Sequence, residues 1–287
     1  MAAIDKVEEA LSITDHSRDS AGLRYVYPVL SRRAGGVSIG VNLNPNNACN
    51  WRCVYCQVPD LARGSAPEID LGLLERELRA FIGRVLRGDF IERQAADGAR
   101  RLVDVALSGN GEPTSARAFP QVVALVGAVL AETGLAKSVR VRVITNGSLI
   151  ARPAVLEGLR RLAAMDGEVW FKVDAGTAAG FRRINNVALS PDAVAKRLAR
   201  CADICATWVQ TCVFGWDGKG PDEIALRAYR DLLLQAGVAR LRGAHLYGLA
   251  RPSLQPEAGR LSRLSAEQIA PLAALLRREG LTVTVSP

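Results

Sequence analysis

The stretch GVSIGVNLNPNNACNWRCVYC, residues Gly36–Cys56, decides the fold of this chain. Its first part, Gly36–Leu43, is an almost continuous apolar run, as expected for a strand that is covered on both faces. Asn44-Pro45-Asn46-Asn47 then ends the strand, because asparagine and proline favour turns and supply local hydrogen bonds. A C-x3-C-x2-C loop follows directly, formed by Cys49, Cys53 and Cys56.

The cysteine spacing favours an iron–sulfur cluster. Three thiolates hold three corners of a four-iron cubane and leave one iron open to a substrate or cofactor. Zinc is an alternative, but it takes four ligands, and the histidines, His16 and His245, are both distant in sequence. Structural or disulfide-bonded cysteines are a second alternative, although three neighbouring cysteines cannot all pair locally.

Further apolar runs, rich in Val, Ile and Leu, alternate with amphipathic stretches. The predicted strands are Val37–Leu43, Leu102–Leu107, Val139–Ile144, Glu168–Val173, Thr207–Phe214, Ala239–Leu246 and Leu281–Val285. The predicted helices are Leu71–Leu86 with Asp70 as its cap, Pro120–Glu132, Pro153–Ala163, Pro191–Ala202 capped by Ser190, Pro221–Gln235, and one from Ser265 to Arg278. Repeated alternation predicts an α/β fold of parallel β/α units that curl into a partial (β/α)6 barrel.

The length of 287 residues and a hydrophobic content of 49% allow a large core. We expect an N-terminal extension over 1–35, a catalytic core over 36–250, and a C-terminal helix and strand over 251–287 that pack on the core. Met1–Glu9 lacks the pattern of a signal peptide, and no apolar run is long enough to span a membrane. These features predict a cytoplasmic protein.

The formal net charge is +8, and the excess is mostly arginine. A basic chain of this kind is compatible with a polyanionic partner such as nucleic acid. A compositional bias toward arginine would produce the same charge, so the charge alone does not identify a partner.

Polar residues follow the predicted strands at their carboxyl ends, which is where a barrel of this kind places its active site. Ser108–Thr114 contains two glycines and Glu112, and Thr145–Ser148 is a small polar cluster. Each segment alone is also compatible with an ordinary turn, in which Glu112 would be solvated. Lys172 and Asp174 alternate along the fourth strand, so they face either each other, as a structural ion pair, or a ligand.

Together these motifs resemble the radical S-adenosylmethionine (SAM) enzymes, whose C-x3-C-x2-C loop follows the first strand of a partial (β/α)6 barrel. The resemblance implies that Cys49, Cys53 and Cys56 ligate a [4Fe-4S] cluster and that SAM chelates its open iron. It also implies further SAM contacts: Tyr55 near the adenine, Gly109, Gly111 and Glu112 at the amino group, Thr145 and Asn146 at the ribose, and Asp174 at SAM or substrate.

The chemistry that this resemblance implies is reductive cleavage of SAM followed by hydrogen abstraction from a substrate, an oxidoreductase or lyase type of reaction. It needs an external, flavodoxin- or ferredoxin-like electron donor. Short segments, including Gln210–Gly218 and Leu246–Ser253, resemble the branch of the tRNA-wyosine synthesis enzymes, which makes a tRNA base the first expectation for the substrate. A small molecule or peptide is the alternative. A noncatalytic iron–sulfur or metal-binding protein is the alternative from another class.

The sequence departs from that of the archaeal wyosine enzymes in one respect. Those enzymes carry a second cluster, and its cysteine ligands precede the C-x3-C-x2-C motif. This chain has no cysteine before Cys49. The remaining cysteines, Cys201, Cys205 and Cys212, lie among apolar residues, so we expect core packing, with an auxiliary cluster as the alternative. His245, Lys172 and Tyr247 are further candidates for the cavity lining.

Overall fold

The computed structural model describes residues 22–31, 34–87, 90–94 and 100–287. Met1–Glu9 and His16, which entered the sequence analysis, lie outside these residues. The described chain forms two compact units. The first contains residues up to Asn50 together with Gly64–Ile144 and Arg152–Glu168, and the second contains Trp51–Arg63, Thr145–Ala151 and Val169–Pro287.

The first unit holds four neighbouring strands in the order β1-β2-β5-β6. Their bounds are β1 (Val26–Ser31), β2 (Gly36–Val41), β5 (Leu102–Leu107) and β6 (Arg140–Thr145), and a short β3 (Ala48–Cys49) follows β2. The pairs β2–β5 and β5–β6 are parallel, whereas β1 pairs antiparallel with β2. All six residues of β2 are buried, as its apolar sequence predicts.

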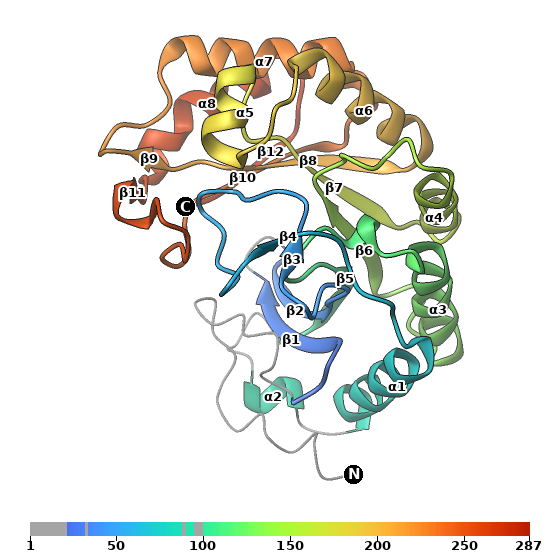
Figure 1. The fold of residues 1–287 in the computed structure, drawn as a ribbon. Coiled ribbons are helices and arrows are strands. Elements are labelled where there is room, and N and C mark those ends of the chain that lie inside the picture. Colours follow the sequence, from blue (N-terminus) through green and yellow to red (C-terminus); the bar gives the residue numbers. More distant parts are fainter. Residues whose placement is uncertain (1–21, 32–33, 88–89, 95–99) are drawn as a thin grey trace. The chain divides into compact units, whose positions relative to one another are not determined.

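The helices of the first unit are α1 (Leu71–Arg87), α2 (Phe90–Gln94), α3 (Phe119–Glu132) and α4 (Pro153–Ala164), with a 3-10 turn at Pro113–Ser115. Helices α1, α3 and α4 follow one another along the outside of this unit (Figure 1). Asp70 Oδ1 accepts a hydrogen bond from the backbone N–H of Leu73 at 2.9 Å, which confirms the predicted cap of α1.

Strand β1 is anchored by a buried carboxylate of α1. Glu77 is 7% exposed, and its side-chain oxygens accept the backbone N–H groups of Arg24 (2.9 Å), Tyr25 (2.8 Å) and Val26 (3.3 Å). These three donors satisfy a carboxylate that would otherwise be strongly unfavourable inside a core. The Glu77 side chain on α1 therefore stabilises the start of β1.

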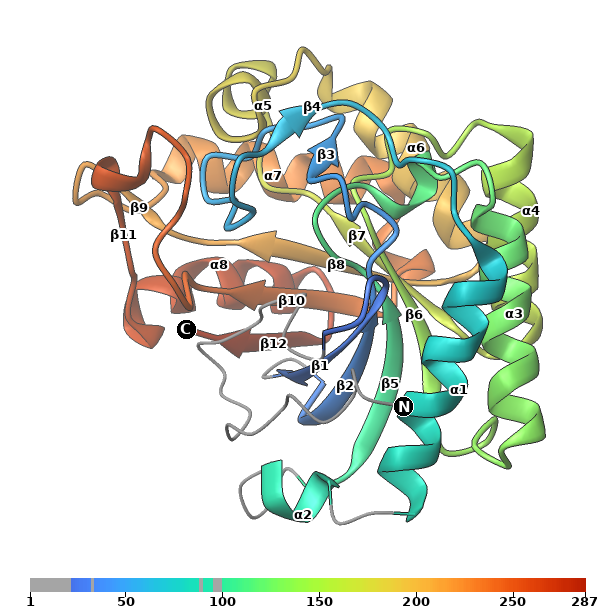
Figure 2. The same cartoon turned by 60° about the horizontal axis from the view of Figure 1, so that its bottom comes forward.

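The second unit contains the strand order β7-β8-β10-β12. The bounds are β7 (Glu168–Lys172), β8 (Ala206–Cys212), β10 (Gly243–Tyr247) and β12 (Val283–Ser286), with short strands β4 (Ala62–Arg63), β9 (Gly215–Trp216) and β11 (Leu261–Ser262). Strand β10 is parallel to both β8 and β12, and these three strands lie side by side in Figure 2. Strands β9 and β11 pair antiparallel.

The helices of the second unit are α5 (Ala178–Asn185), α6 (Pro191–Ile204), α7 (Glu223–Ala236) and α8 (Ala266–Arg278), with 3-10 turns at Val238–Arg240 and Ala258–Arg260. Ser190 caps α6 as predicted, and Ser265 and Gln268 form a capping box at the start of α8. Helix α7 begins at Glu223, two residues later than predicted, because Asp222 is its N-cap. The predicted strand Ala239–Leu246 is shorter, since Val238–Arg240 forms a 3-10 turn after Gly237.

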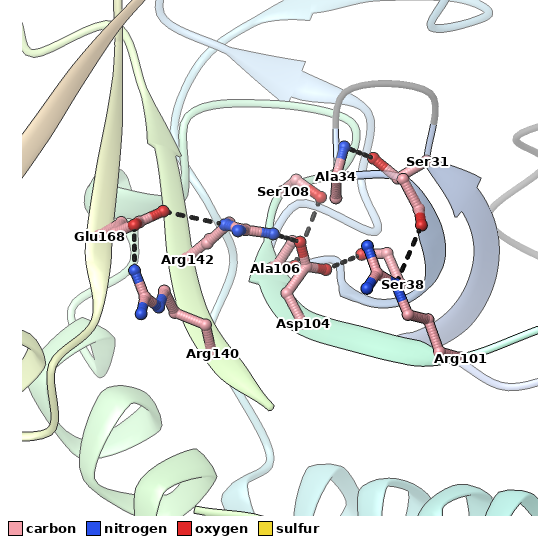
Figure 3. A network of polar contacts seen from close by, with 11 residues as sticks. Ser31, Ala34, Ser38, Arg101, Asp104, Ala106, Ser108, Arg140, Arg142 and Glu168 are labelled. Carbon is pink, nitrogen blue, oxygen red and sulfur yellow. Dashed lines mark hydrogen bonds and ion pairs between the residues drawn. The ribbon is translucent and has the colours of Figure 1, made fainter. Parts of the chain in front are cut away.

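A network of charged and polar side chains, with its carboxylates buried, crosses the strands of the first unit (Figure 3). Ser38 on β2 donates to Asp104 on β5, Asp104 pairs with Arg142 on β6, and Arg142 Nε lies 3.1 Å from Glu168 Oε2. Arg140 completes the chain by pairing with Glu168. The carboxylates of Asp104 and Glu168 are 2% and 7% exposed, so their charges are offset by the two arginines.

The strand and helix pattern confirms the expectation of an α/β fold with mostly parallel strands. Among the described residues, no helix has the length and apolar character that crossing a membrane would require.

Candidate cofactor site

In the first unit, the segment before Cys49 is held against the turn that follows β5. Asn42 is 2% exposed, and its Oδ1 accepts the backbone N–H groups of Asn44 (3.0 Å) and Asn110 (3.1 Å). Asn44 Nδ2 in turn donates to the carbonyl oxygen of Ala48 at 2.9 Å. Asn42 therefore joins the ends of β2 and β5, and Asn44 holds the segment that leads to Cys49.

Two glycines permit this close approach. Gly109 has a φ of +146°, and a Cβ there would lie 2.3 Å from Asn42 Oδ1. A Cβ at Gly111 would lie 2.1 Å from the carbonyl oxygen of Ala48, the residue before Cys49. Only glycine fits at either position, so the turn and the cysteine-bearing segment are packed backbone to backbone.

Glu112 follows these glycines and is only 2% exposed. Its Oε1 accepts hydrogen bonds from the backbone N–H of Thr114 (3.2 Å) and from Thr114 Oγ1 (2.6 Å). The alternative of a solvated glutamate is therefore wrong. A carboxylate is held in the interior at the carboxyl end of β5, where a cationic ligand group would be favoured.

In the second unit, the segment with Cys53 and Cys56 is fixed through its backbone. Val54 N donates to the carbonyl oxygen of Ile184 at 2.8 Å, and Ser253 Oγ donates to the carbonyl oxygen of Val54 at 2.6 Å. Leu254 N donates to the carbonyl oxygen of Cys56 at 3.0 Å. The end of α5 and the 253–257 segment thus hold this part of the loop, and both cysteines are half-buried thiols outside any disulfide.

A polar cluster, which we name the Asp174 centre, lies beside this segment and consists of Tyr55, Lys172, Asp174 and Asn185. Asp174 Oδ2 accepts the hydroxyl of Tyr55 at 2.5 Å and Asn185 Nδ2 at 2.7 Å, and Lys172 Nζ lies 3.7 Å from the same oxygen. Asp174 Oδ1 accepts the backbone N–H of Cys212 at 3.1 Å. Lys172 also donates to the Tyr55 hydroxyl, so Lys172 and Asp174 face each other, as one of the two sequence-based alternatives requires.

Asn185 connects the Asp174 centre to a cysteine. It is fully buried, and its Nδ2 lies 3.2 Å from Cys53 Sγ in addition to its bond to Asp174. Its Oδ1 is buried without a hydrogen-bond partner among the described residues. Leaving a buried acceptor unpaired is unfavourable by about 1–3 kcal/mol. An orphaned acceptor beside a thiol fits a site that is completed by a bound group.

The charges of this centre shift the pKa values of its members. Burial, followed by the negative charge of Asp174, holds the pKa of Tyr55 well above its usual value. Burial alone would lower the pKa of Lys172, but Asp174 together with the nearby Tyr247, Cys53 and Cys212 outweighs burial and holds this pKa well above its ordinary value. Lys172 is therefore a cation and Tyr55 a neutral donor at neutral pH. Burial raises the pKa of the Cys53 thiol to about 11.

The turn after β6 is stabilised by hydrogen bonds from its own backbone to its own side chains. Thr145 Oγ1 accepts the backbone N–H of Gly147 and Asn146 Oδ1 accepts that of Ser148, both at 3.0 Å. Gly147 has a φ of +67°, and a Cβ there would lie 2.0 Å from the ring of Phe171. Thr145 and Asn146 are both buried, so the turn is a fixed local structure within the second unit.

The other candidates of the sequence analysis behave as structural residues. Cys201, Cys205 and Cys212 are buried, and burial raises the pKa of Cys201 to about 12. Helix α6 ends at Ile204, and Cys205 is the residue that caps its end. His245 stacks on Trp208, with ring centroids 4.5 Å apart, and shares a hydrogen bond of 2.6 Å with Thr284. Tyr247 OH lies 3.5 Å from Lys172 Nζ.

Two residues of the site are missing from the sequence-based prediction. Asn185 contacts Cys53, which lies 132 positions earlier, and no local pattern reveals such a contact. Arg52, inside the cysteine loop, forms two hydrogen bonds of 2.8 Å with Glu257 and one of 3.0 Å with Asn186 Oδ1. The sequence offers one signal for these contacts, the pair Asn185-Asn186 after a short amphipathic stretch, which is typical of a helix end. In the structure, Asn186 takes the left-handed conformation of a helix cap.

Comparisons with known proteins agree with this geometry. A family model described as the radical SAM superfamily matches residues 43–226. A radical SAM methyltransferase from Sphaerobacter thermophilus is similar in structure, with a TM-score of 0.62 and 15% identity over 91% of this chain and 68% of that one. A structure described as polyhistidine-tagged anSMEcpe with bound AdoMet has a TM-score of 0.50 and 14% identity, and covers 86% of this chain and 63% of that one.

No curated protein matches this sequence. At such low identities the two structural likenesses show the fold alone, and the likeness over 91% of the chain confirms the predicted class, a partial barrel of β/α units with parallel strands.

Proposed function

The chain belongs to the radical SAM superfamily, and from this premise we propose that Cys49, Cys53 and Cys56 hold the [4Fe-4S] cluster that members of this superfamily use together with SAM. The cluster and SAM, when bound, supply a one-electron cleavage of SAM to methionine and a 5′-deoxyadenosyl radical that takes a hydrogen atom from the substrate. The protein supplies binding, orientation and the exclusion of water.

The observation that carries the proposal is the position of Asn185. One amide group donates both to Cys53, an expected cluster ligand, and to Asp174, an expected contact of SAM or substrate. A single fully buried side chain therefore fixes the distance between a ligand and a polar group of the site. Its unpaired Oδ1 fits a bound donor that the protein itself does not supply.

The other expected contacts have chemistry suited to SAM. Glu112 offers a buried carboxylate to the amino group, and Gly109 and Gly111 let the turn that carries it pack against the segment before Cys49. Thr145 and Asn146 are assigned to the ribose hydroxyls, and Tyr55 to the adenine. Lys172 Nζ lies 3.7 Å from Asp174 Oδ2, so its positive charge offsets the buried carboxylate, which serves as a hydrogen-bond acceptor.

The test is anaerobic reconstitution followed by an assay of SAM cleavage. We expect about four irons per chain and the formation of 5′-deoxyadenosine with a chemical reductant. Replacement of Cys49, Cys53 or Cys56 by alanine removes both. The buried Cys201→Ala variant is the matched control and keeps both. A wild-type protein with neither a cubane spectrum nor 5′-deoxyadenosine after full reconstitution would contradict the proposal.

For the substrate, we propose a tRNA base, on the strength of the net charge of +8 and the resemblance to the wyosine branch. Binding to tRNA should weaken as salt rises, because phosphate contacts release counterions. Absence of tRNA binding at low salt would remove this substrate class and leave a small molecule or peptide.

A further inference from the structure

The second unit carries a concentration of positive charge around the Cys53–Cys56 segment. Four sequence stretches, 51–63, 182–186, 216–219 and 250–263, contain eight cations and three anions, so their net charge is +5 out of +8 for the chain. We name the following residues the arginine rim: Arg52, Arg63, Arg182, Arg183, Arg251, Arg260 and Arg263.

These stretches are neighbours in space as well as in charge. Arg52 and Arg63 both bond to Asn186, the residue after α5. Further contacts join the remaining stretches: Arg183 and Arg260 lie over the ring of Trp216 at 4.2 and 4.9 Å from its centroid, and Gln57 Nε2 donates to the carbonyl oxygen of Arg251 at 2.9 Å. The rim is therefore one continuous surface region of the second unit.

An exposed apolar side chain lies within the rim. Leu254 is 58% exposed, although its backbone N–H donates to the carbonyl oxygen of Cys56 at 3.0 Å. Arg251 and Arg260 flank this leucine in the sequence, and an exposed apolar residue within a basic stretch fits the usual anatomy of a protein interface, with an apolar centre inside a polar border. A surface for single-stranded RNA would instead present aromatic faces for stacking, and the ring of Trp216 is already covered by guanidinium groups.

We propose that the arginine rim with Leu254 is the docking surface for an acidic electron-donor protein. This inference rests on the proposed function, which requires one electron from outside the chain. On docking, a reduced flavin or iron–sulfur centre of the donor is oxidised by one electron and the cluster is reduced by one. The backbone N–H of Leu254 donates a hydrogen bond to the carbonyl oxygen of Cys56. A partner that contacts Leu254 therefore lies beside an expected cluster ligand. Charge complementarity would steer the encounter.

The experiment measures the rate at which a reduced acidic flavodoxin reduces the reconstituted protein, at low and high salt. The variant is Arg182→Glu/Arg263→Glu, two exposed rim residues outside the Asp174 centre. We expect the second-order rate at low salt to fall by about tenfold or more and its salt dependence to flatten. Leu254→Gln should slow reduction without changing the salt dependence. Arg200→Glu, exposed on α6 outside the rim, is the matched control and should leave the rate unchanged.

Dithionite separates the possible outcomes, because a small reductant needs no docking surface. Normal cleavage of SAM with dithionite, together with slow reduction by flavodoxin, supports the inference. An unchanged flavodoxin rate in the charge-reversal variant overturns it, as does a loss of RNA binding with no change in that rate. Wild-type protein that holds a cluster but does not cleave SAM with dithionite would overturn the proposed function as well.

Discussion

Two networks of buried charge differ in whether they are complete. In the first unit, Asp104 and Glu168 are both paired with arginines, and the chain of contacts ends at Ser38 and Arg140. In the second unit, the Asp174 centre leaves Asn185 Oδ1 without a partner among the described residues. A complete network stabilises strands, whereas an incomplete one beside a thiol is suited to a ligand. The difference separates a structural network from a functional one.

The largest expected effect comes from Asp174→Asn. This change leaves Lys172 buried without its anion, and breaking such a pair costs about 3 kcal/mol or more. If that loss falls on the SAM-bound state, the rate of SAM cleavage falls about 100-fold. The matched control is Asp104→Asn in the complete network, and its folded fraction should cleave SAM at nearly the wild-type rate. Equal losses in both variants would erase the distinction between the networks.

The next effect concerns stability. Arg142→Met removes the cation shared by Asp104 and Glu168, and we expect the free energy of unfolding to fall by about 3 kcal/mol. Lys172→Met should destabilise less, because Asp174 keeps three hydrogen-bond donors, from Tyr55, Asn185 and Cys212. Urea denaturation of the two variants measures this order. A larger loss for Lys172→Met would mean that the Asp174 centre carries the fold.

A smaller effect is the pH dependence of the complete network. Burial would raise the pKa of Glu168, but the hydrogen bonds and charges of Arg140 and Arg142 together outweigh it and hold the pKa below its usual value. The folded state therefore binds the proton less readily than the unfolded state. This contribution to stability is present above the unfolded pKa of about 4.3 and is lost as pH falls below it. The urea midpoint of wild type should fall more between pH 7 and pH 3 than that of Glu168→Gln.

The smallest effect tests Asn185 as a positioning residue. Its hydrogen bond to Cys53 Sγ draws charge from the sulfur and favours a reduced cluster. A bond worth about 1 kcal/mol corresponds to roughly 40 mV for one electron, so Asn185→Leu should lower the midpoint potential by about this amount. Thr207→Val is the matched control, because it removes a hydrogen bond to the sulfur of Cys201, which is not an expected cluster ligand, and it should leave the potential unchanged. A redox titration followed by electron paramagnetic resonance measures both, and equal potentials for Asn185→Leu and wild type would exclude the role.

Local pattern predicts much of this fold. Leu102–Leu107 has the predicted bounds, and α1 extends one residue beyond its prediction, because apolar spacing and capping residues are local properties. Strand β1, which contains Pro28, is missing from the predicted strands. Proline is tolerated here because β1 is the edge of the sheet and pairs only with β2.

The site is predicted less completely than the fold. Cys53 and Asp174 follow from motifs, and the structure links them through Asn185. Asn185 itself and the Arg52–Glu257 pair depend on contacts between distant parts of the chain, which spacing cannot reveal. Glu112 was visible as a carboxylate, but its burial and its bonds to Thr114 are properties of the packed turn.

The anchoring of β1 by Glu77 has a consequence for hydrogen exchange. The amides of Arg24, Tyr25 and Val26 donate to a side chain of a helix that lies more than 50 positions away. Their protons exchange with solvent only when β1 separates from α1, so these amides report the opening of an edge rather than local fraying. In Glu77→Ala the three amides should exchange faster together, while amides in the middle of β5 keep their protection.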